Sequence, residues 1–119
     1  MEDETLQMTM LIDFFGDLLT EKQREYLDLY HNEDLSLSEI AEKDGITRQG
    51  AHDIITRAER KLAEIEKKTG VVKRWLYMQT ELRQAEAAAK ELLQLSNGKG
   101  KPAELAQDLV LTLEGLKGS

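Results

Sequence analysis

The sequence predicts an all-α protein with a helix-turn-helix head and a C-terminal helical hairpin. Three observations predict this class. Aromatic residues make up only 5% of the 119 residues, so a group typical of β-strands is scarce. Apolar residues recur at steps of three and four along the chain, without convincing period-two alternation. Between Leu35 and Arg60, a short helix, a turn containing Gly and a second helix follow in the order of a helix-turn-helix.

Two predicted helices form the front of the chain. The first spans about residues 5–18, where six apolar residues fall at helical spacing: Leu6, Met10, Leu11, Phe14, Phe15 and Leu18. Thr20 then has the character of an N-cap, with Gln23 as its capping-box partner. The second helix follows and ends at residues 32–34. Two of its residues are expected to contact the core: Leu27 and Tyr30.

The next two helices make up the helix-turn-helix. Ser36 caps the first of them, and Glu39 completes a Ser-x-x-Glu capping box. Gly45 ends it, because glycine adopts a left-handed turn at little cost. Thr47 caps a long helix that runs to about Lys68. Their buried faces are predicted from apolar spacing: Ile40 and Ala41, then Ala51, Ile54, Ile55, Ala58, Leu62 and Ile65.

Two further helices are predicted after a break at Thr69–Gly70. One runs from Val71 to about Leu95, and the loop 96–101 follows it. Pro102 suits the first turn of the last helix. The apolar stripe of the earlier helix is Val72, Trp75, Leu76, Leu82, Ala85, Ala89, Leu92 and Leu93. That of the last helix is Leu105, Ala106, Leu109, Val110, Leu113 and Leu116.

The break divides the chain into two predicted domains, a helix-turn-helix domain at 1–70 and a helical hairpin at 71–119. The hairpin carries more apolar surface than a head of this size obviously needs. Two arrangements account for it: packing on the head, or pairing between two chains. We expect the second, a homodimer.

The composition excludes several functions. The chain has no Cys, which rules out disulfides, thiolate catalysis and Cys-ligated metals. Its longest apolar run has four residues, too short to span a bilayer, and its acidic opening residues do not predict a signal peptide. The sequence shows neither a catalytic Ser-His-Asp set nor a phosphate-binding Gly-rich loop. We therefore expect a cytoplasmic protein that is not an enzyme and has no metal or other cofactor.

The net charge of −7 argues against nucleic-acid binding, but the charge is unevenly spread. Residues 1–42 hold 2 basic and 12 acidic residues, a net −10. Residues 43–68 hold 7 basic and 5 acidic residues, a net +2. Residues 69–119 hold 7 and 6, a net +1. The most basic segment therefore coincides with the second helix of the helix-turn-helix.

Candidate contacts to nucleic acid lie at the start of that helix, because its N-terminal residues reach base edges in the major groove. Here they are Thr47, Arg48, Gln49 and His52. Arg pairs with guanine and Gln with adenine, while Thr47 and the helix N-terminus suit a phosphate. Four basic residues would supply further charge: Lys43, Arg57, Arg60 and Lys61. The alternative is a merely solvated first turn, since many helical hairpins never touch DNA.

Roughly residues 8–70 resemble the bacterial YlxM family. The resemblance is carried by Asp13-Phe14-Phe15, the stretches 18–26, 29–30, 34–42 and 46–49, and Asp53, Arg57 and Glu59. It implies a helix-turn-helix similar to region 4 of bacterial sigma factors, with a winged-helix-like mode of DNA binding, in a small cytoplasmic protein. Genes of this family commonly sit beside those for the signal recognition particle GTPase and its receptor, which implies a role in that pathway or its regulation.

Two hypotheses about function follow. In the first, the protein is a regulator of this pathway that binds DNA, or the particle RNA, through the residues named above. In the second, it is an interaction module for the particle GTPase, its receptor or its RNA, and the acidic first helices are its working surface.

Overall fold

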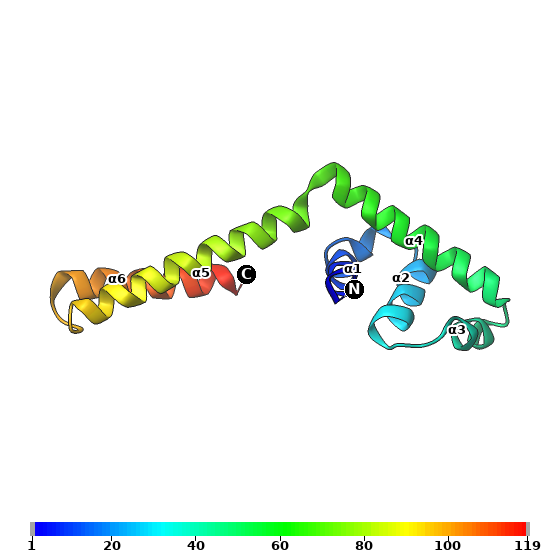
Figure 1. The fold of residues 1–119 in the computed structure, drawn as a ribbon, viewed down its shortest axis with the longest axis horizontal. Helices are drawn as coiled ribbons and strands as arrows, with labels where there is room; N and C mark the ends of the chain where they lie inside the picture. The colour runs from blue at the N-terminus through cyan, green and yellow to red at the C-terminus, as the bar shows by residue number, and fades with distance from the viewer. Residues whose placement is uncertain (1, 119) are drawn as a thin grey trace. The chain divides into compact units, whose positions relative to one another are not determined.

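The structure, a computed structural model, describes residues 2–118, with side chains from residue 6 onward (Figure 1). It has six α-helices and two short turns of other helix types, and the described part contains no strand: α1 (Glu2–Phe15), η1 (Gly16–Leu18), α2 (Glu21–Leu27), η2 (Asp28–Asn32), α3 (Leu37–Asp44), α4 (Arg48–Thr69), α5 (Val71–Leu95) and α6 (Gly100–Lys117). The all-α prediction is confirmed. The chain forms two compact units, residues 1–72 and residues 73–119.

The three N-caps predicted for the first unit, Thr20, Ser36 and Thr47, are confirmed. Both capping boxes form: the Thr20 hydroxyl accepts from the Gln23 N–H, and the Ser36 hydroxyl accepts from the Glu39 N–H, each at 3.1 Å. The first helix begins earlier than predicted, at Glu2, and ends three residues earlier, because residues 16–18 form the 3₁₀ turn η1.

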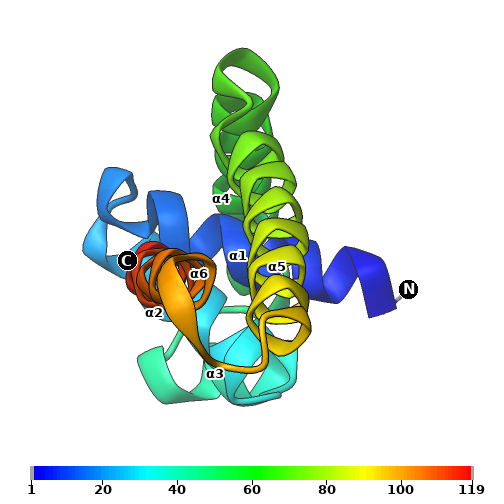
Figure 2. The same cartoon turned by 90° about the vertical axis from the view of Figure 1, so that its left-hand side faces the viewer.

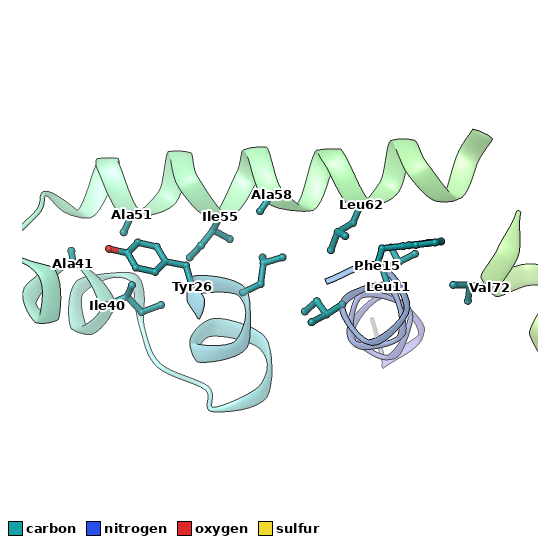
Figure 3. Packing of buried hydrophobic residues seen from close by; sticks show 12 residues of the cluster. Leu11, Phe15, Tyr26, Ile40, Ala41, Ala51, Ile55, Ala58, Leu62 and Val72 are labelled. Atoms are coloured by element: carbon teal, nitrogen blue, oxygen red, sulfur yellow. The ribbon is translucent and has the colours of Figure 1, made fainter. Parts of the chain in front are cut away.

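The core of the first unit lies where α4 crosses α1, α2 and α3 (Figure 3). Its buried apolar residues are Leu11, Ile12, Phe15, Tyr26, Leu27, Ile40, Ala41, Ala51, Ile55, Ala58, Leu62 and Val72. Ile54 and Ile65 of the predicted α4 stripe pack against this cluster and are partly buried. Leu6 and Leu18, predicted for the first apolar stripe, are more than half exposed instead.

One core prediction for the second helix is wrong. Tyr30 is 37% exposed, whereas Tyr26 is fully buried. The reason is the π-helical turn η2, which winds the chain with more residues per turn and so changes which side chains face inward. His31 takes the inward position, and its Nε2 lies 2.8 Å from Oε2 of Glu59 on α4.

The second unit consists of α5 from residue 73 onward and α6, which returns along α5 (Figures 1 and 2). The buried apolar residues here are small: Ala89, Ala103, Ala106 and Val110. Glu86 is also buried, and its carboxylate pairs with Lys90 at 3.1 Å and with Lys117 of α6 at 2.9 Å. The hydrogen bonds from these two ammonium groups lower the pKa of Glu86.

The apolar stripes predicted for α5 and α6 are only partly buried. Six of the predicted core residues are exposed: Leu76, Ala85, Leu92, Leu105, Leu109 and Leu116. The apolar stripe on each helix is wider than the narrow line along which α5 and α6 touch. Pairing the two helices in a hairpin therefore leaves one side of each stripe exposed. α6 also begins at Gly100, two residues before Pro102, so the loop is shorter than predicted. No helix in the described residues is long and apolar enough to cross a membrane.

Candidate nucleic-acid interface

The helix-turn-helix is built by α3, a three-residue turn and α4. α3 ends at Gly45, whose φ of 66° is left-handed, and the Gly45 N–H donates back to carbonyls of the last turn. The Ile46 N–H donates to the Ala41 carbonyl at 3.0 Å, which closes the turn, and the Ile46 side chain packs against the core. The predicted order of helix, glycine turn and helix is therefore present.

The first turn of α4 is exposed, as direct contact with a ligand requires. Thr47 is its N-cap, and its hydroxyl oxygen accepts from the Gly50 N–H at 2.9 Å. Arg48 and Gln49 follow as exposed residues, and His52 lies one turn later, also exposed. Arg48 has no ion pair or hydrogen-bond partner among the side chains that the structure describes. Its guanidinium is available to a base or a phosphate.

Asp53 was not among the predicted contact residues, yet it engages two of them. Its Oδ1 accepts a 2.9 Å hydrogen bond from the Gln49 amide and lies 3.8 Å from Nδ1 of His52. Asp53 therefore occupies one of the two N–H donors of Gln49 and leaves the other N–H and the carbonyl oxygen for an adenine. The signal was in the sequence: residues four apart on a helix face each other, and Asp53 follows Gln49 by four.

The four supporting basic residues fall into two groups. Lys43 pairs with Glu25 at 2.9 Å, and the hydrogen bond that its ammonium group donates to this carboxylate raises the pKa of Lys43. Lys61 donates to the Leu18 carbonyl at 2.9 Å, so it ties α4 to the turn η1. Arg57 and Arg60 are exposed and have no partner among the described side chains. Two of the four charges are thus already engaged within the protein.

The surroundings of the site are acidic. Residues 1–72 hold 9 basic and 17 acidic residues, a net −8, against 7 and 6, a net +1, in residues 73–119. Beside the turn, Asp44 accepts a 2.5 Å hydrogen bond from the buried Tyr26 hydroxyl and lies 3.8 Å from Lys22. Burial and this hydrogen bond raise the pKa of Tyr26 to about 12. The candidate interface is therefore a small group of basic side chains within a unit whose net charge is negative.

This geometry defines a helix-turn-helix protein, with an exposed second helix that carries unpaired arginines. Comparison with known proteins places it more narrowly. The model of the UPF0122 family, described as "Putative helix-turn-helix protein, YlxM / p13 like", matches residues 2–97. The chain belongs to this family.

Individual relatives agree with the assignment. A UPF0122 protein of Halalkalibacterium halodurans is 41% identical over 116 residues, which cover 98% of this chain and 96% of the relative. A UPF0122 protein of Thermoanaerobacter sp. (strain X514) is 51% identical over 74 residues, 62% of this chain. The match spans only 63% of the length of that Thermoanaerobacter protein. The family match ends before α6, whereas the H. halodurans match extends over nearly the whole chain.

Proposed function

We propose that this protein is a non-enzymatic, cytoplasmic regulator that binds nucleic acid, DNA in the first place, through the exposed start of α4. The observation that carries the proposal is Arg48, which stands unpaired on the first turn of the second helix of a helix-turn-helix. In this architecture that turn enters the major groove.

Each residue of the first turn has a role in the proposal. Arg48 donates two hydrogen bonds to a guanine edge or to a phosphate. The Thr47 hydroxyl hydrogen and the N-terminal N–H groups of α4 point to a phosphate oxygen. Gln49 and His52 read bases with the polar groups that Asp53 does not engage. Arg57 and Arg60 supply phosphate contacts further along α4, and Lys43 and Lys61 add positive charge nearby.

The cellular setting of the proposal is the signal recognition particle pathway. Its support is the resemblance of residues 8–70 to the YlxM family, whose genes commonly sit beside those of the particle GTPase and its receptor. The particle RNA is therefore a second nucleic acid to test beside DNA.

A second candidate function is protein binding, and specific observations favour it. Lys43 and Gln49 are already held by Glu25 and Asp53, and the first unit has a net charge of −8. Such a surface suits a basic partner. In this reading the helix-turn-helix is a scaffold, and the partner is the particle GTPase or its receptor.

Binding to labelled DNA, to the particle RNA and to the GTPase over a salt series tests the two candidates. Phosphate contacts make the affinity for nucleic acid fall steeply as salt rises. Arg48→Ala should weaken that binding about tenfold or more, because a bidentate arginine contact is lost. Arg83→Ala is the matched control, since Arg83 is an exposed arginine of the second unit.

Asp53→Asn separates the candidates by the sign of its effect. Removing this carboxylate should strengthen nucleic-acid binding, because it lifts a repulsion beside the phosphate and loosens the hold on Gln49. The same change should weaken binding to a basic protein. Binding to the GTPase alone, unchanged by Arg48→Ala, would reject the nucleic-acid proposal.

A further inference from the structure

The second unit places its large apolar side chains on the outside and its small ones inside. The buried apolar residues between α5 and α6 are three alanines and one valine. Exposed are Met78 and Leu92 of α5, at 58% and 46%, and Leu105, Leu109 and Leu116 of α6, at 52%, 49% and 50%. Soluble monomers rarely expose so many large apolar groups together.

These five residues and the exposed Ala85 form one surface, which we call the leucine face: Met78, Ala85, Leu92, Leu105, Leu109 and Leu116. The side of α5 that faces α6 includes three partly or fully buried residues: Gln79, Glu86 and Leu93. Each of them directly follows a residue of the leucine face, namely Met78, Ala85 or Leu92. On α6, Leu105, Leu109 and Leu116 come directly before Ala106, Val110 and Lys117, which are buried or partly buried.

On both helices, the residues of the leucine face are therefore rotated about the helix axis in the same sense, away from the line along which α5 and α6 meet. In an antiparallel pair, the same rotation on both helices leads to the same side of the hairpin. The return of α6 along α5 (Figures 1 and 2) and the ion pair from Lys117 to Glu86 fix this antiparallel arrangement. The leucine face is thus continuous across both helices.

We propose that the leucine face binds the leucine face of a second copy of this chain, so that two hairpins form a four-helix bundle. A two-fold axis brings identical apolar stripes together and needs no other protein. α6 has 18 residues and is about 27 Å long, and two helices side by side are roughly 20 Å wide. That footprint, roughly 500 Å² before side-chain relief is counted, approaches the roughly 800 Å² per partner of a standard interface.

Charge favours a second copy over other occupants. The second unit has a net charge of only +1, so two copies meet here without strong repulsion, whereas the first unit has −8. A nucleic acid or an anionic membrane would require a strongly basic rim. The outer edge of the leucine face instead mixes signs, with exposed Glu81 on α5 and exposed Lys101 and Asp108 on α6. A second copy related by a two-fold axis can place its acidic residues opposite these basic ones, and its basic residues opposite the acidic ones.

Sedimentation equilibrium of the full chain over a wide concentration series, without nucleic acid, tests the proposal independently of the function proposed above. The wild-type chain should approach twice its 13.5 kDa mass. The double variant Leu105→Glu, Leu109→Glu should raise the dimer dissociation constant about 100-fold or more, because it places two charges in an apolar interface.

Leu111→Glu is the matched control. Leu111 is 58% exposed on the same helix but follows Val110 instead of preceding it, so it lies off the leucine face. This variant should dimerise like the wild type. A wild-type mass of 13.5 kDa at every concentration overturns the proposal. So does a double variant that stays dimeric, or a Leu111→Glu variant that dissociates equally.

Circular dichroism of each variant checks that the helices persist. If the double variant loses helix content, the single change Leu92→Lys on α5 decides instead, since it adds one charge to the other half of the same face. An unchanged dissociation constant for Leu92→Lys would contradict the proposal.

Discussion

At the scale of single residues, the helix-turn-helix is held by a polar contact inside its apolar core. Tyr26 is fully buried, and its hydroxyl donates to Asp44 on the last turn of α3, just before the glycine turn. The ring fills the space between α2, α3 and α4, while the hydroxyl ends at a partly exposed carboxylate. One side chain thus both packs the core and ties α2 to the end of α3.

We expect Tyr26→Phe to destabilise the first unit by about 1–2 kcal/mol, because it removes a hydrogen bond to a charged acceptor but keeps the ring. Urea unfolding followed by circular dichroism measures this. Asp44→Asn provides the control, since its amide still accepts from Tyr26 without the charge. A loss below the error of the measurement would show that water replaces the bond at no cost.

The raised pKa of Tyr26 also predicts an alkaline dependence of stability. The folded protein binds the phenolic proton more tightly than the unfolded chain, whose tyrosine pKa is 10.0, against about 12 when folded. This contribution to stability is fully present below pH 10.0 and is lost as the pH rises toward about 12. Unfolding measured across this range should show the loss in the wild type and not in Tyr26→Phe.

At the scale of elements, three helices of the first unit begin with the same device. Thr20, Ser36 and Thr47 each accept a hydrogen bond from the backbone N–H three residues later. In the first two, that later residue is Gln23 or Glu39, which completes a capping box. In α4 it is Gly50, which has no side chain to reach back.

Gly50→Ala should therefore stabilise the first unit by about 0.5–1 kcal/mol, since alanine is the better helix former. A Cβ at residue 50 would lie 3.1 Å from the Thr47 hydroxyl, so the cap must shift by a few tenths of an ångström. The N-caps of α2 and α3 accommodate a Cβ at the same position, so we expect the substitution to stabilise the protein. Thermal unfolding measures the change in stability. A melting temperature below that of the wild type would mean that the Thr47 side chain cannot shift to make room for the Cβ.

At the scale of the whole molecule, the acidic charge and the helix-turn-helix belong to one unit, and the leucine face belongs to the other. All buried members of the large core lie within residues 1–72. The second unit buries only a few small apolar residues. The ligand recognition and the self-association that we propose thus belong to different parts of the chain.

A fragment of residues 1–74 should fold by itself, because it keeps the whole core, including Val72 at its edge. Circular dichroism and thermal unfolding should show a cooperative transition. A shorter fragment, 1–70, lacks Val71 and Val72 and should be less stable by about 1–3 kcal/mol. Equal stability of the two fragments would show that these valines add nothing to the core.

Local chemistry was enough to predict much of the fold. The capping residues Thr20, Ser36 and Thr47, the left-handed Gly45 and the break at Gly70 depend only on neighbours within a few positions, so the sequence displays them directly. The buried face of α4 follows equally from apolar spacing. Belonging to the UPF0122 family agrees with the resemblance carried by residues 8–70.

Tertiary structure decided what depends on distant partners. The π turn at 28–32 moved Tyr30 outward and His31 inward, which the regular spacing of a helix could not predict. The partners of Lys43 and Lys61 come from 18 and 43 residues away, so only folding could show that these cations are engaged. Spacing marks which residues share a helix face, but which face is covered depends on where the chain returns. That return left most leucines of α6 exposed, Leu105, Leu109 and Leu116 among them.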